Sequence, residues 1–130
     1  MKDLTSEFEP IIDHRGFIQD LVVNTQIKAV THIYSYKDKV RGDHYHKETE
    51  QYNYVASGSL MLATRNPGEE KIRINRFEKG SFFLIETSEH HAMKFIEDSL
   101  IVVFTIGPRA GKEYETDTYR LLESLFSKNQ

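Results

Sequence analysis

Short runs of β-branched and aromatic residues recur along this chain, and turn-forming residues separate them. Among the separators are Ser57-Gly58, Asn66-Pro67-Gly68 and Gly107-Pro108. Many short strands at close and even spacing predict an all-β fold, either a sandwich or a small barrel. The predicted strands are Phe17–Val23, Ala29–Tyr36, Gln51–Ala56, Leu60–Arg65, Lys71–Phe77, Phe82–Ile85, His91–Phe95 and Leu100–Thr105.

The C-terminal tail has a different pattern. Between Thr118 and Phe126, apolar residues recur at the spacing of one helix face, at Leu121, Leu122 and Leu125. We therefore predict a short helix over 118–126 that packs against one end of the barrel.

Length and charge exclude several classes of protein. The chain has 130 residues, which predicts one domain over residues 1–130. Its 17 basic and 20 acidic residues give a net charge of −3, which argues against binding to nucleic acid. There is no apolar run long enough to span a membrane and no cysteine for a disulfide or a thiolate zinc site. We therefore expect a soluble, cytoplasmic protein without a nucleic-acid or membrane partner.

Two of the six histidines lie two positions apart, in the segment RGDHYH at residues 41–46. In a strand, residues two apart point to the same face and lie about 7 Å from each other. His44 and His46 are therefore expected to project side by side. Two imidazoles on one buried face need hydrogen-bond partners, which is costly unless the site is used. The lone His14 and His32 are expected to be ordinary polar residues.

The residues around this pair resemble the motifs of the cupin family. Gly58 follows the pair, Gly80 opens a second motif, and His91 stands where that motif has its histidine. Glu86 and Ser88 replace the proline and glycine of the second motif. The resemblance covers most of the chain. It implies a small jelly-roll barrel of the cupin type, with the predicted helix at its C-terminus.

Metal-binding cupins hold one divalent ion through three histidines and a glutamate, and the corresponding residues here are His44, His46, Glu50 and His91. The family spacing, however, puts Gln51 at the position of the glutamate. Adjacent residues of a strand point to opposite faces, so only one of the two can face the histidines. An amide oxygen is a poorer ligand for a divalent cation than a carboxylate. This favours a site without a cofactor, and a divalent transition metal held by these four residues is the alternative.

Two branches of the cupin superfamily that need no metal resemble the chain more specifically. Residues 40–45 resemble the catalytic segment of the dTDP-4-dehydrorhamnose 3,5-epimerases, and residues 41–59 resemble the sugar-nucleotide 3,4-ketoisomerases more closely. Both branches have an early Asp-x-Arg-Gly turn, matched here by residues 13–16, and the chain length fits the ketoisomerases. The resemblance implies an isomerase of a nucleotide-linked 4-keto-6-deoxy sugar.

The chemistry implied by this resemblance is proton transfer next to a ketone. A base removes the proton at carbon 3 to leave an enediolate. Return of a proton to carbon 4 moves the ketone to carbon 3, whereas return to the other face of carbon 3 gives an epimer. His44 and His46 would be the catalytic acid–base pair, because a histidine pKa near 6.5 suits proton transfer at neutral pH. Which of them is the base is left open.

The same resemblance implies candidates for the acid and a quaternary structure. Tyr114 and Tyr119 are candidates for the C-terminal tyrosine acid of the epimerases. Exposed strand edges, together with the resemblance, predict a homodimer. A role in polysaccharide biosynthesis is also implied. The expected substrate-binding residues are Arg41, Tyr34, Gln51 and His91.

The sequence leaves two other functions open. One is a metal-dependent cupin enzyme, either a dioxygenase or an isomerase, which measured metal content would reveal. The other is a non-catalytic sugar-binding barrel, which would bind a nucleotide sugar without converting it.

Overall fold

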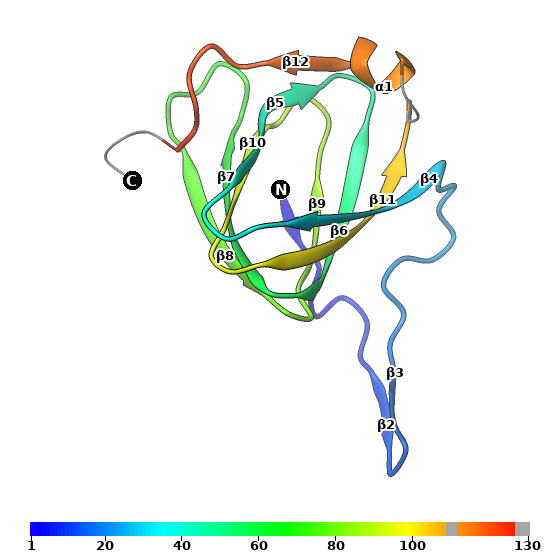
Figure 1. Ribbon diagram of the computed structural model, residues 1–130. Helices are drawn as coiled ribbons and strands as arrows, with labels where there is room; N and C mark the ends of the chain where they lie inside the picture. The colour runs from blue at the N-terminus through cyan, green and yellow to red at the C-terminus, as the bar shows by residue number, and fades with distance from the viewer. Residues whose placement is uncertain (109–111, 127–130) are drawn as a thin grey trace.

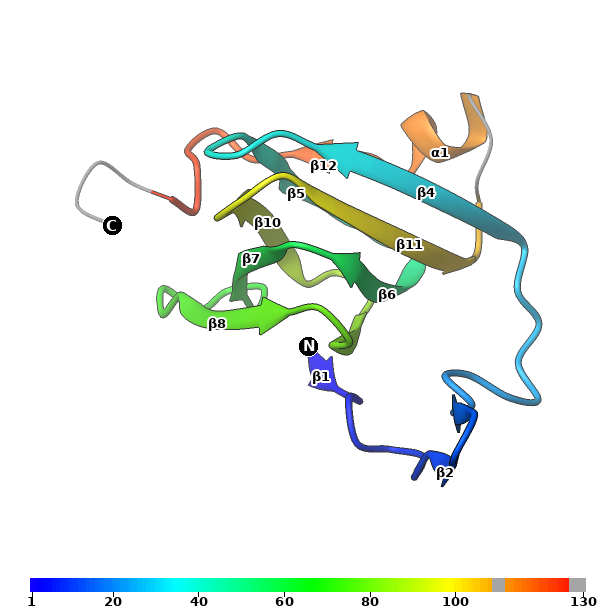
Figure 2. The ribbon, with the colours of Figure 1, turned by 60° about the horizontal axis from the view of Figure 1, so that its bottom comes forward.

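Two five-stranded antiparallel sheets face each other in the computed structural model, which describes residues 1–108 and 112–126 (Figures 1 and 2). In spatial order, the first sheet contains β1 (Lys2–Asp3), β9 (Phe82–Ile85), β6 (Glu50–Ser57), β11 (Ser99–Ile106) and β4 (Ala29–Ser35). The second contains β12 (Thr118–Arg120), β5 (Val40–His46), β10 (His90–Phe95), β7 (Ser59–Arg65) and β8 (Arg73–Glu78). A separate hairpin consists of β2 (Ile11–Asp13) and β3 (Gly16–Ile18), and α1 spans Lys112–Thr116.

The hydrophobic core fills the space between the two sheets. Phe83 of β9, Phe95 of β10 and Leu62 of β7 have no exposed surface. Along β11 the residues alternate between buried and half-buried, because successive side chains of a strand point to opposite faces. Complete burial of one such side chain contributes about 1.5–3 kcal/mol to stability. Apart from the short helix α1, every regular element among the described residues is a strand, so the all-β prediction is confirmed.

Seven of the eight predicted strands occur, with ends shifted by at most two residues. The prediction for Phe17–Val23 is wrong beyond Ile18, where β3 ends. A strand needs a neighbour to satisfy its N–H and C=O groups. No strand among the described residues pairs with residues 19–23, and this segment is irregular.

The helix predicted over 118–126 is also wrong, because Thr118–Arg120 forms β12 and pairs with β5. The next residues are held by Asp43, whose main-chain oxygen accepts the N–H of Leu121 and whose Oδ1 accepts the N–H of Leu125, at 2.9 and 2.8 Å. Leu125 is buried against the second sheet. These contacts outweigh the local preference for a helix. The helix of this region is α1, earlier in the chain, and no helix among the described residues could cross a membrane.

Gly58 connects β6 to β7 where the chain approaches another strand closely. Its φ is +86°, and a Cβ there would lie 2.6 Å from the carbonyl oxygen of Asp98 and 2.7 Å from the Cα of Ser99. Both neighbours are backbone atoms and cannot easily move. The glycine of the first cupin motif is therefore required by packing as well as by its left-handed conformation.

We expect Gly58→Ala to lower the free energy of unfolding by about 3 kcal/mol, because strain and overpacking add at this position. Gly68→Ala is a matched control, since Gly68 also has a positive φ, +77°, but a Cβ there would have no atom within 4 Å of it. The control is expected to lose only about 1 kcal/mol. Urea denaturation followed by circular dichroism measures both, and equal losses would contradict the packing argument.

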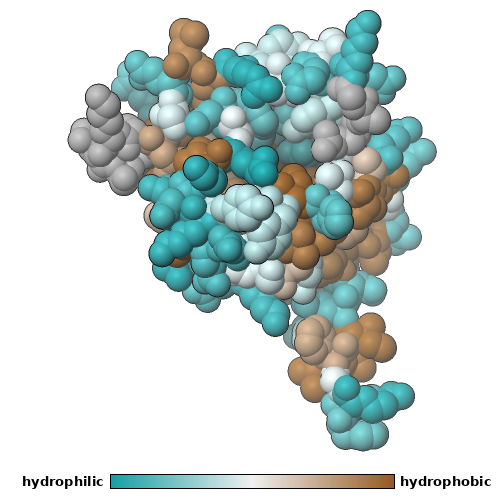
Figure 3. Space-filling model, viewed as in Figure 1, coloured by the Kyte–Doolittle hydropathy of each residue, from teal (hydrophilic) through white to brown (hydrophobic). Residues whose placement is uncertain are grey.

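The hairpin of β2 and β3 extends from the body of the molecule as an arm (Figure 1). Its large apolar side chains are between 67 and 73% exposed, and Figure 3 shows them gathered in brown on the arm. An isolated two-stranded hairpin is at best marginally stable in water. The arm therefore has an unburied apolar surface, formed by Ile11, Ile12, Phe17 and Ile18.

Candidate active site

A distortion in β5 turns the first histidine of the pair toward the interior. Gly42 and Asp43 both have positive φ angles, +95° and +56°, and the pairing with β10 shifts register between His91 and Ala92. A Cβ on Gly42 would lie 2.9 Å from the carbonyl oxygen of His91. The glycine two residues before His44 thus permits the close approach of β10, which brings His91 to the pair.

Three histidines converge inside the barrel. The ring centroids of His44 and His46 are 4.7 Å apart, so the predicted side-by-side arrangement is present. The centroid of His91 lies 4.6 Å from that of His44 and 5.4 Å from that of His46. His46 and His91 are buried, with 2 and 3% of their surface exposed. His91 is far from the pair in the sequence. Its strand, β10, pairs with β5 and places His91 next to His44.

Hydrogen bonds orient two of these rings. His46 Nδ1 lies 3.1 Å from the main-chain oxygen of Asp117, and its Nε2 lies 3.3 Å from the hydroxyl oxygen of Tyr114. A carbonyl oxygen can only accept, so Nδ1 donates its proton to Asp117 and Nε2 can accept the proton of the Tyr114 hydroxyl. His91 Nδ1 donates to the main-chain oxygen of Glu89 at 3.1 Å.

Burial keeps two of the imidazoles neutral. It lowers the pKa of His44 to about 4, with smaller contributions from the nearby His46 and Arg120. Burial, followed by the proximity of His44, lowers the pKa of His91 to about 3. In addition, His44 Nδ1 is buried without a hydrogen-bond partner among the described residues. Both rings are therefore unprotonated at neutral pH and able to accept a proton.

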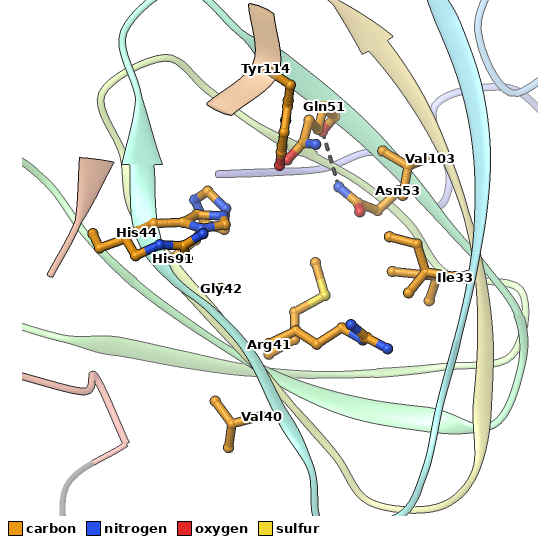
Figure 4. A pocket seen from close by; sticks show the side chains of 13 residues that line it. Ile33, Val40, Arg41, Gly42, His44, Gln51, Asn53, His91, Val103 and Tyr114 are labelled. Atoms are coloured by element: carbon orange, nitrogen blue, oxygen red, sulfur yellow. Dashed lines mark hydrogen bonds between the residues drawn. The ribbon is translucent and has the colours of Figure 1, made fainter. Parts of the chain in front are cut away.

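His44 and His91 form one wall of a pocket of about 450 Å³ (Figure 4), and His46 is not among its lining residues. Tyr114 and Gln51 point into it from one end, and Arg41 lies at the opposite end. The other lining residues include apolar side chains, among them Met93 and Val103, which also belong to the core. The pocket thus combines proton-transferring, charged and apolar surfaces. Its lining residues are Ile33, Val40, Arg41, Gly42, His44, Gln51, Asn53, His91, Met93, Ile101, Val103, Tyr114 and Arg120.

The structure places most of the expected substrate-binding residues in this pocket. Gln51 is buried and lines it, as does Arg41, whose Nε donates to Ser35 Oγ at 2.7 Å. Tyr34 does not meet the histidines, and the expectation that it belongs to this site is not met. Its neighbour Ile33 faces the pocket, so Tyr34 points to the outer face of β4, where 53% of it is exposed.

Three residues of the site were not found by sequence reasoning. Asn53 lies two positions from Gln51 on β6, so strand alternation could have indicated it. Arg120 lines the pocket opposite His44 in the pairing of β12 with β5, and Asp117 orients His46. Both come from the C-terminal segment, whose structure the sequence did not predict, and no local signal assigns them to the site.

The donor set fits a divalent metal ion only in part. The potential ligand nitrogens of the three histidines lie within 4.8 Å of one another. The predicted fourth ligand, Glu50, does not line the pocket, because the adjacent Gln51 faces it instead. The four-residue metal site therefore does not form in this structure. Three histidines alone could hold an ion such as Zn²⁺, which would polarise a carbonyl oxygen.

Two facing antiparallel sheets with this histidine cluster between them define the chain as a cupin, as the sequence motifs predict. A profile of the family described as FdtA: WxcM-like, C-terminal matches residues 2–126. The chain belongs to this family. No curated protein sequence matches it significantly.

Solved structures share its fold. QdtA, a sugar 3,4-ketoisomerase from Thermoanaerobacterium thermosaccharolyticum in complex with TDP, superposes with a TM-score of 0.73 at 22% identity, over 88% of this chain and 85% of QdtA. The WlaRB TDP-quinovose 3,4-ketoisomerase from Campylobacter jejuni gives 0.76 at 22% identity, over 92 and 91% of the two chains. A dTDP-4-dehydrorhamnose 3,5-epimerase from Sulfolobus tokodaii gives 0.74 at 17% identity, over 91 and 76%.

Proposed function

We propose that this protein is a sugar-nucleotide 3,4-ketoisomerase, which moves the ketone of a nucleotide-linked 4-keto-6-deoxy sugar from carbon 4 to carbon 3. The observation that carries the proposal is the convergence of neutral imidazoles and a tyrosine hydroxyl on one pocket, in a chain of the WxcM-like family. Isomerisation needs a base that is unprotonated at neutral pH and an acid within reach of the same substrate.

His44 is the base in this proposal. Its ring is neutral and lines the pocket. Removal of the proton at carbon 3 moves the electron pair onto the oxygen at carbon 4. Return of a proton to carbon 4, with transfer of the hydroxyl proton of carbon 3 to the oxygen at carbon 4, leaves the ketone at carbon 3 and a hydroxyl group at carbon 4.

A base with a pKa of about 4 is weak, so the enediolate needs strong stabilisation from the other residues of the pocket. Tyr114 is suited to this role, because its hydroxyl enters the pocket and is hydrogen-bonded to His46. We assign the acid function to Tyr114 together with His46. Gln51 and His91 would bind the hydroxyl groups of the sugar.

Two cationic residues could bind the diphosphate of the substrate. Arg41 is held by Ser35 and by the main-chain oxygen of Tyr34, which leaves part of its guanidinium group directed to the pocket. Arg120 also lines the pocket and is paired only loosely, at 3.6 Å, with the exposed Glu115. Arginine binds phosphate oxygens through planar pairs of donors, which suits both positions.

Incubation with TDP-4-keto-6-deoxyglucose in deuterated water tests the proposed function. NMR spectroscopy should show a 3-keto product with deuterium at carbon 4. Deuterium at carbon 3 of a 4-keto product with inverted configuration at that carbon would indicate an epimerase instead. Binding of the sugar nucleotide without any deuterium incorporation would indicate a non-catalytic barrel.

Metal content is tested on the same protein. We propose that the reaction needs no metal, because the carboxylate that would complete the ligand set is absent from the pocket. Activity should therefore survive treatment with a chelator, and elemental analysis should find less than one ion per chain. Stoichiometric metal together with loss of activity on its removal would favour a metal-dependent isomerase.

We further propose a homodimer in which the apolar arm of β2 and β3 packs against a second copy. A free arm with four large apolar side chains exposed would be unstable, and the outer face of β4 also exposes Val30 and Tyr34. Phe17→Asp is expected to shift the protein from dimer to monomer in light scattering. A matched change at an exposed apolar residue elsewhere, Leu122→Asp, should leave the mass unchanged.

A cytoplasmic location and a role in polysaccharide biosynthesis remain part of this proposal.

A further inference from the structure

Asp117 lies at the junction of α1 and β12, and only 5% of it is exposed. A buried carboxylate needs hydrogen-bond donors. Its Oδ1 accepts the N–H of Lys47 at 3.1 Å, both oxygens accept the N–H of Glu48 at 3.1–3.2 Å, and Oδ2 accepts the hydroxyl of Thr49 at 2.7 Å. All three donors belong to the turn that directly follows His46.

The main chain of the same residue contacts both members of the proposed acid pair. The N–H of Asp117 donates to the main-chain oxygen of Tyr114 at 3.1 Å, and its carbonyl oxygen accepts from His46 Nδ1 at 3.1 Å. The hydroxyl of Thr118 also donates to the oxygen of Tyr114, at 2.7 Å. Asp117 therefore contacts both residues that form the hydrogen bond between the Tyr114 hydroxyl and His46 Nε2.

We propose that Asp117 is a positioning residue that acts through His46. Its carboxylate fastens the turn at 47–49 to the C-terminal segment, and its carbonyl oxygen holds the His46 ring with the proton on Nδ1. Nε2 is then directed to the hydroxyl of Tyr114. The residue does not line the pocket, so we expect it to act without contacting the substrate.

The charge of Asp117 is consistent with this role. Burial alone would raise the pKa of its carboxyl group, but the hydrogen bonds from Thr49, Glu48 and Lys47 together lower it below the usual value. The group is therefore a carboxylate that can accept from all three donors at neutral pH. An amide at this position has one accepting oxygen and would leave at least one of these contacts weakened.

The kinetic part of this inference rests on the proposed function. Loss of the carboxylate should affect the step in which the acid delivers its proton, and not the binding of the sugar nucleotide. We expect Asp117→Asn to lower kcat by about 10–100-fold, as is typical when a partner that orients a functional histidine is lost. KM should change less than twofold.

A second pair of variants separates positioning from folding. Thr49→Val removes the hydroxyl that donates to Asp117 at nearly constant volume, and Thr49→Ser keeps it. We expect kcat to fall several-fold in the valine variant and to recover in the serine variant. Asp98→Asn is the control, because the exposed Asp98 also accepts a main-chain N–H, from Lys37 at 2.8 Å, far from the site.

The spectroscopic part does not depend on the reaction. Long-range ¹H–¹⁵N correlation spectra of the resting protein report which ring nitrogen of His46 carries the proton. The wild-type protein should show Nδ1 protonated, and Asp117→Asn should show a mixture of both tautomers. An unchanged tautomer, an unchanged kcat in the folded variant, or a loss confined to KM would overturn the proposal. If the wild-type protein converts no sugar nucleotide, the tautomer comparison still decides it.

Discussion

His44→Asn is expected to lower the rate of deuterium exchange at carbon 3 of the sugar by about 10²–10⁴-fold, the usual contribution of a positioned general base. Asparagine is similar in size and polarity to histidine but cannot accept the proton. The substrate should still bind, because Arg41, Gln51 and the other lining residues are unchanged. Proton exchange is the appropriate measurement, since it reports removal of the proton directly.

His32→Asn is the matched control for this variant. His32 lies on β4 and is exposed, whereas its neighbour Ile33 faces the pocket, so the histidine points away from the site. We expect wild-type exchange in the control. If His44→Asn still binds the substrate and exchanges at the wild-type rate, His44 is not the base. His46 and His91 would then be the next candidates.

Acidification is expected to destabilise the fold well above the pH at which carboxyl groups titrate. The pKa of His44 is lowered to about 4 and that of His91 to about 3, whereas histidines of the unfolded chain titrate near 6.5. Above pH 6.5 neither state binds these protons, and the stability is at its full value. As the pH falls below 6.5 the unfolded state binds them first, so the free energy of unfolding decreases.

The magnitude follows from the size of the shift. One pKa unit corresponds to about 1.4 kcal/mol. Because of His91 alone, the free energy of unfolding should fall by about 3 kcal/mol between pH 6.5 and pH 4. His44 acts in the same direction. The lowered pKa of Asp117 contributes only below the ordinary aspartate value of 3.8, outside this interval.

Urea denaturation at a series of pH values measures this effect, with circular dichroism as the signal because the chain has no tryptophan. His91→Asn should show a shallower dependence on pH than the wild-type protein, whatever its stability at neutral pH. The exposed His14 provides the control, and His14→Asn should retain the wild-type dependence. A free energy of unfolding that is constant from pH 6.5 to 4 would show that the histidines are not buried as neutral groups.

Local patterns were sufficient for much of the fold. Short β-rich runs bounded by turn residues are visible in the sequence from Ala29 to Thr105, and they correspond to strands. Because residues two apart in a strand share a face, the sequence also correctly put His44 beside His46. Gly58 could also be recognised, because a motif glycine marks a backbone conformation that other residues avoid.

The C-terminal segment is where sequence reasoning failed, and it supplies half of the proposed acid–base machinery. The helical spacing of Leu121 and Leu125 is genuine, but the open edge of β5 offers hydrogen bonds that a helix could not use. That edge is formed by residues far earlier in the chain. A local stretch of sequence therefore does not show that pairing with β5 competes with helix formation. Tyr114, Asp117 and Arg120 reach the site only as a result of it.

The sequence by itself therefore determined the β architecture, the adjacent histidines and the glycines that the turns require, because these depend on neighbours along the chain. Only the tertiary structure decided that Gln51 and not Glu50 faces the pocket, that His91 joins the pair, and that His44 and His91 are neutral. Orientation and burial are set by the packing of distant strands, and the pKa of a group follows from its burial.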